Sequence, residues 1–267
     1  MSYIDSIIIL IILELILKNM NKLSAVFWDV DGTIADTELC GHRVAFNLAF
    51  KDFNLDWYWN ENKYLQLLKI SGGLNRIINF RDEIKSQLTN EICSKIQSRK
   101  SFHYKELIKS GKIKVRDGVI RLIQELFEFN VKQFIVTTSG KASLDPFLQM
   151  SMNSYVKYFS KIITYEDVNK HKPFPDAYNL AVKLAKIPRI NCLAIEDSRI
   201  GIEAAKAANI NCLLTLPPWS NSIKNITKGA TACVDRLGNE NNKSNIIYGK
   251  PLNNKMVDFA YLTNIIN

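Results

Sequence analysis

Short apolar runs alternate with longer amphipathic stretches along most of this chain. Residues 25–28 form the first such run, which has the length and the β-favouring side chains of a buried strand and stops at Asp29. Beyond residue 118, the pattern predicts strands at 131–136, 161–165, 192–195, 212–215 and 232–234, separated by helices at 119–129, 142–152, 176–185 and 200–208. Alternating strands and helices indicate an α/β fold, in which helices cover both faces of a parallel sheet.

The segment that follows the first strand has a different pattern. Residues 37–51 and 74–109 carry apolar side chains at helical spacing, and no convincing strand lies between them. We therefore expect a small helical domain inserted into the sheet-forming core. The predicted domains are an N-terminal extension (1–22), a core (23–36 and 112–238), a helical insertion (37–111) and a C-terminal tail (239–267).

The two ends of the chain lie outside the repeating pattern. Residues 7–17 form an apolar run interrupted by Glu14, which is too short for a membrane-spanning helix and lacks the basic leader of a signal peptide. We expect a short docking helix or an extension upstream of a start at Met20, with a membrane-surface anchor as the alternative. At the other end, 238–254 is polar and Asn-rich and predicts a loop, and 256–266 predicts a closing helix.

The composition is that of an ordinary globular protein, with 47% hydrophobic and 23% charged residues among 267. The formal net charge of +9 favours anionic partners. Because the lysines are scattered and no nucleic-acid motif accompanies them, we expect a phosphorylated metabolite rather than a nucleic acid. The 5 cysteines are widely spaced, which argues against a disulfide framework and a zinc site and indicates a reducing compartment.

Candidate catalytic groups sit at the carboxyl ends of the predicted strands. Asp29 and Asp31 lie two positions apart, so in an extended backbone both face the same site, and Gly32 permits a tight turn directly after them. Two crowded carboxylates repel each other unless a cation or a shared proton relieves them. Thr137 and Asp197 follow two later strands, at the end of the sheet where α/β folds bind their ligands.

Each candidate also has a purely structural interpretation. Lys172 alone is typical of a surface lysine, like its neighbour Lys170, and Thr137 alone is typical of a strand end. Asp197 with Ser198 is typical of a helix N-cap, an interpretation that is compatible with a catalytic role. The gathering of all these groups at strand ends favours a catalytic site.

Four segments, 29–33, 134–139, 172–173 and 195–198, resemble the four signature motifs of the haloacid dehalogenase-like hydrolases, in the order that this family has them. The helical insertion resembles the small cap of the subgroup that includes β-phosphoglucomutase. The resemblance implies a Rossmann-like parallel sheet core with an inserted small all-helical cap domain.

A narrower resemblance covers residues 23–238. The segments 41–47, 56–59, 67–73, 196–201 and 234–238 are similar to the CbbY proteins associated with the Calvin–Benson cycle. This similarity implies dephosphorylation of xylulose 1,5-bisphosphate. Leu74 stands where members of that family often carry Lys, and Arg76 is expected to supply the positive charge instead.

The resemblance assigns a role to each acidic side chain. Asp29 is the expected nucleophile, which attacks phosphorus to form an aspartyl-phosphate, and Asp31 is the expected general acid and base. The family pattern places Mg²⁺ between the Asp29 carboxylate, the Asp31 backbone carbonyl and Asp197, with Glu196 close by. Lys172 is expected to join the metal in stabilising the charge on the transferring phosphoryl group.

The substrate needs further contacts. Thr137 is expected to hydrogen-bond a phosphoryl oxygen, as are backbone N–H groups around Thr138 and Ser139. The helical insertion is expected to contact sugar hydroxyls or a second phosphate, and its candidate residues are Glu38, His42, Arg43, Lys69 and Arg76. A hinge or core position is the alternative for His42, and Trp57 and Trp59 are expected in the core of the insertion.

Together these features predict a soluble Mg²⁺-dependent sugar-bisphosphate phosphatase that acts as a monomer, without nucleic-acid or membrane partners. The alternatives are a phosphoryl transferase like β-phosphoglucomutase and, in a different class, a non-catalytic binding or anchoring protein. The Lys, Asn and Ile richness is similar to that of proteins from AT-rich genomes, including plastid ones, so we expect the plastid stroma or the cytoplasm.

Overall fold

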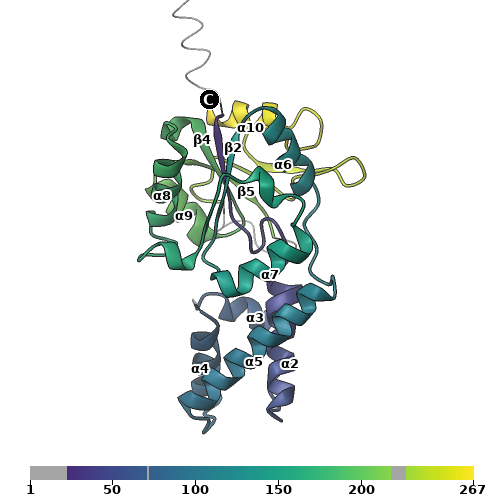
Figure 1. Cartoon of the computed structure of the whole chain (residues 1–267), viewed down its shortest axis with the longest axis vertical. Helices are drawn as coiled ribbons and strands as arrows, with labels where there is room; N and C mark the ends of the chain where they lie inside the picture. Colours follow the sequence, from purple (N-terminus) through teal and green to yellow (C-terminus); the bar gives the residue numbers. More distant parts are fainter. Residues whose placement is uncertain (1–22, 71, 218–226) are drawn as a thin grey trace, which may run out of the picture. The chain divides into compact units, whose positions relative to one another are not determined.

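The structure, a computed structural model, describes residues 23–70, 72–217 and 227–267 in two compact units (Figure 1). The core unit contains the described residues up to Ile34, together with Arg116–Gly140 and Ser154–Asn267. The helical unit contains Ala35–Val115 and Lys141–Asn153. The predicted N-terminal extension lies outside the described residues.

A seven-stranded sheet in the order β3-β2-β1-β4-β5-β6-β7 forms the centre of the core unit. The strands are β1 (Ala25–Trp28), β2 (Lys132–Val136), β3 (Lys161–Ile163), β4 (Cys192–Glu196), β5 (Asn211–Thr215), β6 (Ala232–Val234) and β7 (Ile246–Tyr248). Neighbouring strands are parallel except β7, which runs antiparallel to β6. The predicted α/β fold with a parallel sheet is thus confirmed.

The loop predicted at 238–254 is a partly wrong prediction, because the edge strand β7 lies within it. β7 pairs with Cys233 and Val234 of β6 in an irregular register. Its three side chains are half-buried or exposed, so the strand carries no alternation of buried and exposed positions that a sequence could reveal. The closing helix is present as α10 (Phe259–Ile266), which begins at Phe259 rather than at residue 256.

Helices cover both faces of the sheet. Besides α10, they are α6 (Val119–Glu128), α8 (Asp176–Ala185) and α9 (Arg199–Ala207), with short 3-10 turns at Val156–Tyr158, Tyr165–Asp167 and Arg189–Asn191. α8 and α9 pack on the face that carries Ala25 and Phe27, and α6 and α10 lie on the opposite side in Figure 1. Because β1 and β4 are buried at every position, the strand ends rather than the faces are left for polar chemistry.

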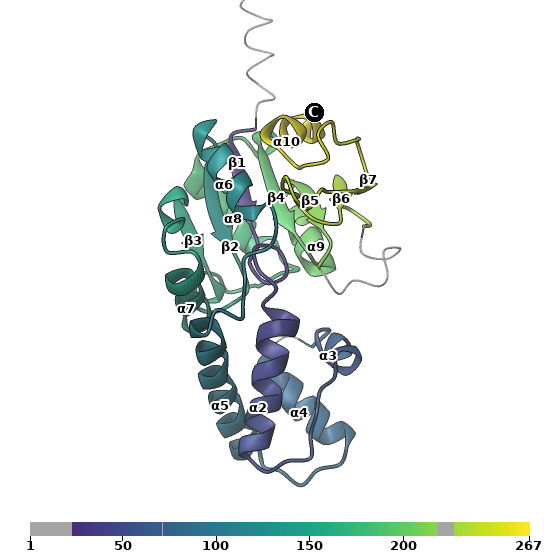
Figure 2. The same ribbon diagram turned by 90° about the vertical axis from the view of Figure 1, so that its right-hand side faces the viewer.

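The helical unit is organised around buried aromatic side chains. Its helices are η1 (Glu38–Arg43), α2 (Val44–Asp52), α3 (Glu61–Leu67), α4 (Gly73–Glu83), α5 (Asn90–Lys109) and α7 (Lys141–Ser151). The Trp59 ring is fully buried, with its centroid 4.6 Å from that of Phe46 and 4.8 Å from that of Phe50, which confirms its predicted core position. α7 packs against α5, although it comes from outside the predicted 37–111 insertion (Figure 2).

Two local features of the helical unit differ from a simple run of α-helices. η1 is a π-helix, in which the His42 N–H donates to the Thr37 carbonyl five residues earlier (2.7 Å). The helical run predicted at 74–109 is divided into α4 and α5, because Lys85 has a left-handed backbone and the Thr89 side chain caps the start of α5. In the part of the chain that the structure describes, no helix has the length and apolarity needed to span a membrane.

Candidate active site

The carboxyl ends of three neighbouring strands bring the candidate catalytic residues together. β1 lies between β2 and β4, so Asp29, Thr137 and Glu196 stand next to one another at the same end of the sheet. The backbone extends this pairing beyond the strands, because the Asp29 N–H donates to the Ile195 carbonyl (3.0 Å) and the Thr137 N–H donates to the Ile163 carbonyl (3.0 Å).

Lys172 is the buried cation of this site. Its ammonium donates to Asp29 Oδ1 (2.7 Å), Glu196 Oε1 (2.6 Å) and the Val136 carbonyl (2.8 Å), which uses all three of its N–H groups. Only 2% of its side chain is exposed, so Lys172 is not a surface lysine. Burial alone would lower the pKa of Lys172, but the carboxylates of Asp29 and Glu196 outweigh it and hold the pKa well above its ordinary value.

Asp29, Glu196 and Asp197 crowd their carboxyl groups, each placing one oxygen within 4.8 Å of the others. Burial, with further contributions from Glu196 and Asp31, raises the pKa of Asp29 to about 8 despite Lys172. Burial and the charges of Asp29 and Glu196 hold the pKa of Asp197 well above its usual range. One ammonium therefore does not neutralise the cluster, and its oxygen-only donors suit a divalent cation such as Mg²⁺.

Two glycines make room for these carboxylates. Gly32 has a left-handed backbone (φ +87°), and a Cβ at this position would overlap the Asp197 carboxylate. A Cβ at Gly201, in the first turn of α9, would overlap the Glu196 carboxylate. Ser198 caps the same helix by accepting from the Gly201 N–H (3.2 Å). The absence of a side chain at Gly32 and Gly201 therefore leaves the space that the carboxylates of Asp197 and Glu196 occupy.

The turn after β2 carries the predicted phosphate-binding residues. The Thr137 hydroxyl is buried and accepts from the Ser139 N–H (3.0 Å), so Thr137 shapes this turn as well as ending the strand. The Ser139 hydroxyl donates to Asp31 Oδ2, which fixes the direction of that carboxyl group. Thr138 lies between them in the same turn. Asp31 and the turn after β2 thus face the same end of the sheet as the Asp29 cluster.

Sequence reasoning missed two residues of this site, Tyr178 and Arg116. The Tyr178 hydroxyl donates to Glu196 Oε1 (2.6 Å), and the only sequence signal for it is its place six residues after Lys172, on the first helix beyond that lysine. The Arg116 guanidinium donates to the Gly32 and Leu216 carbonyls, the latter at 2.6 Å. Its positive charge lowers the pKa of Asp197, though by less than burial raises it.

In the helical unit, Glu38 and Arg76 meet around the Tyr64 hydroxyl. That hydroxyl donates to Glu38 Oε2 (2.5 Å), and Arg76 Nη1 lies 3.4 Å from it. Arg76 is also anchored through Nε to the Ile70 carbonyl (2.9 Å). The Tyr64 side chain is buried, so these two predicted substrate-binding residues have a fixed relative position within the unit.

His42 is buried in the helical unit and faces Lys100. Its Nδ1 lies 2.8 Å from Lys100 Nζ, and its ring stacks on Tyr104 with centroids 4.0 Å apart. Burial first, and then the charges of Lys100 and Arg76, hold the pKa of His42 well below its usual range. The imidazole is therefore neutral, and its position agrees with the core alternative.

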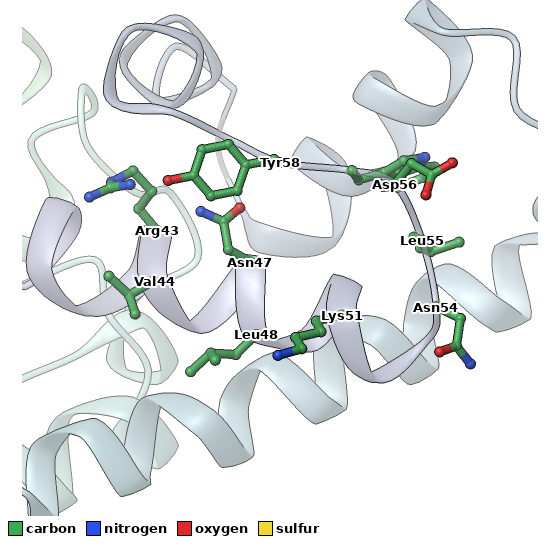
Figure 3. Close-up of a pocket in the computed structure, with 10 residues that line it drawn as sticks. Arg43, Val44, Asn47, Leu48, Lys51, Asn54, Leu55, Asp56 and Tyr58 are labelled. Carbon is green, nitrogen blue, oxygen red and sulfur yellow. The ribbon is translucent and has the colours of Figure 1, made fainter.

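Arg43 lines a cavity of about 700 Å³ in the helical unit, between α2 and the segment that precedes α3 (Figure 3). In that view the Tyr58 hydroxyl points toward the Arg43 guanidinium, with Asn47 beside them. Arg43 also lies 3.5 Å from Glu61 in a partly exposed ion pair. Lys69 is exposed, and of the five candidates of the insertion only Arg43 lines this cavity.

Comparisons with known proteins agree with this geometry. The model of the haloacid dehalogenase-like hydrolase family matches residues 26–215. Protein CbbY (plasmid) of Cupriavidus necator is 34% identical over 222 residues, which cover 81% of this chain and 86% of that protein. A CBBY-like protein of Arabidopsis thaliana is 31% identical over 203 residues, which cover 72% of this chain and 63% of that protein.

A solved structure is similar to this chain in both sequence and fold. A mutant of CbbY from Rhodobacter sphaeroides, crystallised in complex with xylulose-(1,5)bisphosphate, superposes with a TM-score of 0.72 at 29% identity. The match covers 81% of this chain and 96% of that one.

Proposed function

The chain belongs to the haloacid dehalogenase-like hydrolases, and from this membership we propose that it is a Mg²⁺-dependent phosphatase of a sugar bisphosphate, with xylulose 1,5-bisphosphate as its substrate. The observation that carries the proposal is the buried cluster of Asp29, Glu196 and Asp197 around Lys172. Such a cluster supplies a nucleophilic carboxylate, a cation-binding set of oxygens and a fixed positive charge in one place. Because the matched family is described as one of hydrolases, the non-catalytic alternative is not supported.

The reaction proceeds in two displacements. A carboxylate oxygen of Asp29 forms a bond to phosphorus while the bond from phosphorus to the sugar oxygen breaks, and Asp31 gives its proton to that leaving oxygen. Asp31 then takes a proton from a water molecule, whose oxygen attacks the aspartyl-phosphate. Inorganic phosphate leaves, and the Asp29 carboxylate is restored. The Ser139 hydroxyl, which donates to Asp31, keeps the acid in position for both proton transfers.

Lys172 orients Asp29 through the hydrogen bond to Oδ1 and balances negative charge beside it. Asp29, Asp197 and Glu196, together with the Asp31 carbonyl, would hold Mg²⁺, which when bound would further neutralise the charge of the phosphoryl oxygens. The Thr137 hydroxyl and the Thr138 N–H are expected to donate hydrogen bonds to the phosphoryl oxygens, with the Ser139 N–H held by the Thr137 hydroxyl.

Mg²⁺ is expected to stabilise the protein, because it offsets the mutual repulsion of the acidic cluster in the folded state only. The gain in free energy of unfolding is about 2.7 kcal/mol when Mg²⁺ stands about 100-fold above its Kd. Thermal unfolding with and without MgCl₂ measures it. Asp197→Asn is expected to lose most of this gain, whereas Asp176→Asn, at the start of α8, keeps it. An equal Mg²⁺ effect in Asp197→Asn and the wild type would contradict the predicted metal site.

Substrate selection is assigned to the helical unit. Glu38 and Arg76, anchored around the Tyr64 hydroxyl, offer an acceptor for sugar hydroxyls and a donor for a second phosphate. The similarity to a CbbY protein that was crystallised with xylulose-(1,5)bisphosphate supports a sugar bisphosphate as the substrate class. A plastid or cytoplasmic location stays a prediction.

A phosphate-release screen over sugar mono- and bisphosphates, with Mg²⁺ and with EDTA, tests the proposal. We expect the fastest Mg²⁺-dependent release from xylulose 1,5-bisphosphate. Conversion of β-glucose 1-phosphate into glucose 6-phosphate, without release of free phosphate, would indicate a phosphoryl transferase instead. Absence of turnover from every sugar phosphate in the presence of Mg²⁺ would contradict the proposed function altogether.

A further inference from the structure

Tyr178 contributes a buried hydroxyl to the site. The residue is fully buried on α8, and its hydroxyl donates to Glu196 Oε1 at 2.6 Å. The Lys172 ammonium lies 5.2 Å from the centroid of its ring. Burial and the neighbouring charge of Glu196 hold the pKa of Tyr178 well above its usual range, so this hydroxyl keeps its proton and acts as a donor.

The hydroxyl and the Lys172 ammonium share one acceptor atom. Glu196 Oε1 accepts from both groups at 2.6 Å, while Glu196 Oε2 accepts from the Ser198 hydroxyl at 3.4 Å. Glu196 is fully buried, so its Oε1 atom has no solvent to satisfy it. Without the Tyr178 hydroxyl, Glu196 Oε1 would depend on Lys172 alone.

Lys172 has no free N–H group with which to form a second hydrogen bond to Glu196. Its three N–H groups already serve Asp29, Glu196 and the Val136 carbonyl. A more negative Glu196 Oε1 would draw the ammonium toward itself and lengthen the bond to Asp29 Oδ1. The hydroxyl of Tyr178 therefore determines the relative strengths of the hydrogen bonds that the Lys172 ammonium donates to Asp29 and to Glu196.

We propose that Tyr178 is a positioning residue for phosphoryl transfer, which acts through Glu196 to keep the Lys172 ammonium on the nucleophile Asp29. This inference rests on the proposed function, because it assigns Asp29 as the nucleophile. It predicts that loss of one oxygen atom, with the ring retained, slows the chemical step and leaves substrate binding alone.

Tyr178→Phe is expected to lower kcat about 10-fold, the size typical of a hydrogen bond to a charged group, without a change in KM. The probes are xylulose 1,5-bisphosphate and para-nitrophenyl phosphate, both with saturating Mg²⁺. Tyr261→Phe is the matched control, because it removes another hydroxyl of the core unit that donates to a backbone carbonyl, that of Lys250, at 3.2 Å. We expect the control to keep the wild-type kcat and KM with both probes.

The possible results distinguish failure of the proposed function from failure of the role of Tyr178. If the wild type releases phosphate from neither probe, the proposed function fails. If the wild type is active and Tyr178→Phe has the same kcat, only the positioning role of Tyr178 is overturned. A loss of kcat that Tyr261→Phe reproduces, or that comes with an equal rise in KM, also overturns it, since a general packing defect then explains the result.

Discussion

Asp29→Asn is expected to lower the rate of phosphate release at least about 10³-fold, because an amide cannot attack phosphorus in place of a carboxylate. The fold is expected to persist. Burial raises the pKa of Asp29 to about 8 in the metal-free protein, so an uncharged group at this position suits the surroundings better than the carboxylate does. The amide oxygen of the substituted side chain can still accept the hydrogen bond of Lys172, which keeps the ammonium partnered.

Initial rates of phosphate release and thermal unfolding of the same preparations check this prediction. Asp145→Asn, at an exposed acid on α7 of the helical unit, is the control and is expected to leave the rate within about twofold of the wild type, as most surface substitutions do. Substantial residual turnover in Asp29→Asn, with a catalytic contaminant excluded, would refute the nucleophile assignment.

Lys172→Ala is expected to be the most destabilising change at this site. It leaves Asp29 and Glu196 without the ammonium that both contact, and removing one partner of a buried ion pair costs about 3–5 kcal/mol of free energy of unfolding. The phosphate-release rate is expected to fall at least about 10²-fold, because a fixed charge that stabilises the transferring group is lost.

Denaturant unfolding in EDTA and in MgCl₂ measures the stability change and separates its causes. Because Mg²⁺ and the ammonium offset the same negative charge, the deficit of Lys172→Ala is expected to be smaller with Mg²⁺ than with EDTA. Lys170→Ala is the control, since Lys170 is exposed and only two residues away. A Lys172→Ala protein as stable as Lys170→Ala in EDTA would contradict the buried geometry.

The sheet and the carboxylates at its strand ends could be predicted because each depends on a short, local sequence pattern. The apolar run before Asp29 and the run before Glu196 each deliver a carboxylate at the point where a strand ends. Parallel pairing of β1 with β4 then brings these strand ends together. Two short sequence patterns are therefore enough to predict that the two carboxylates lie close together in the fold.

The partners of the predicted residues were harder to find, because they come from distant parts of the chain. Lys100 contacts His42 across 58 positions, and Arg116 contacts Gly32 across 84. Lys100 did carry a local signal, since it lies on the buried stripe of α5 between Ile96 and Tyr104, at spacings of four. A lysine on an apolar stripe indicates a buried partner, but the sequence does not name that partner.

The π-helix η1 makes the length of its segment as important as its side chains. A π-turn holds one residue more than an α-turn, so deleting one residue between Thr37 and Val44 would remove the i→i+5 hydrogen bond of η1 and change the rotation of α2 about its own axis. Phe46 and Phe50 would then no longer face Trp59, and the Trp59 ring would lose its contacts with both. Single-residue deletions here should therefore be as damaging as the loss of a large aromatic side chain.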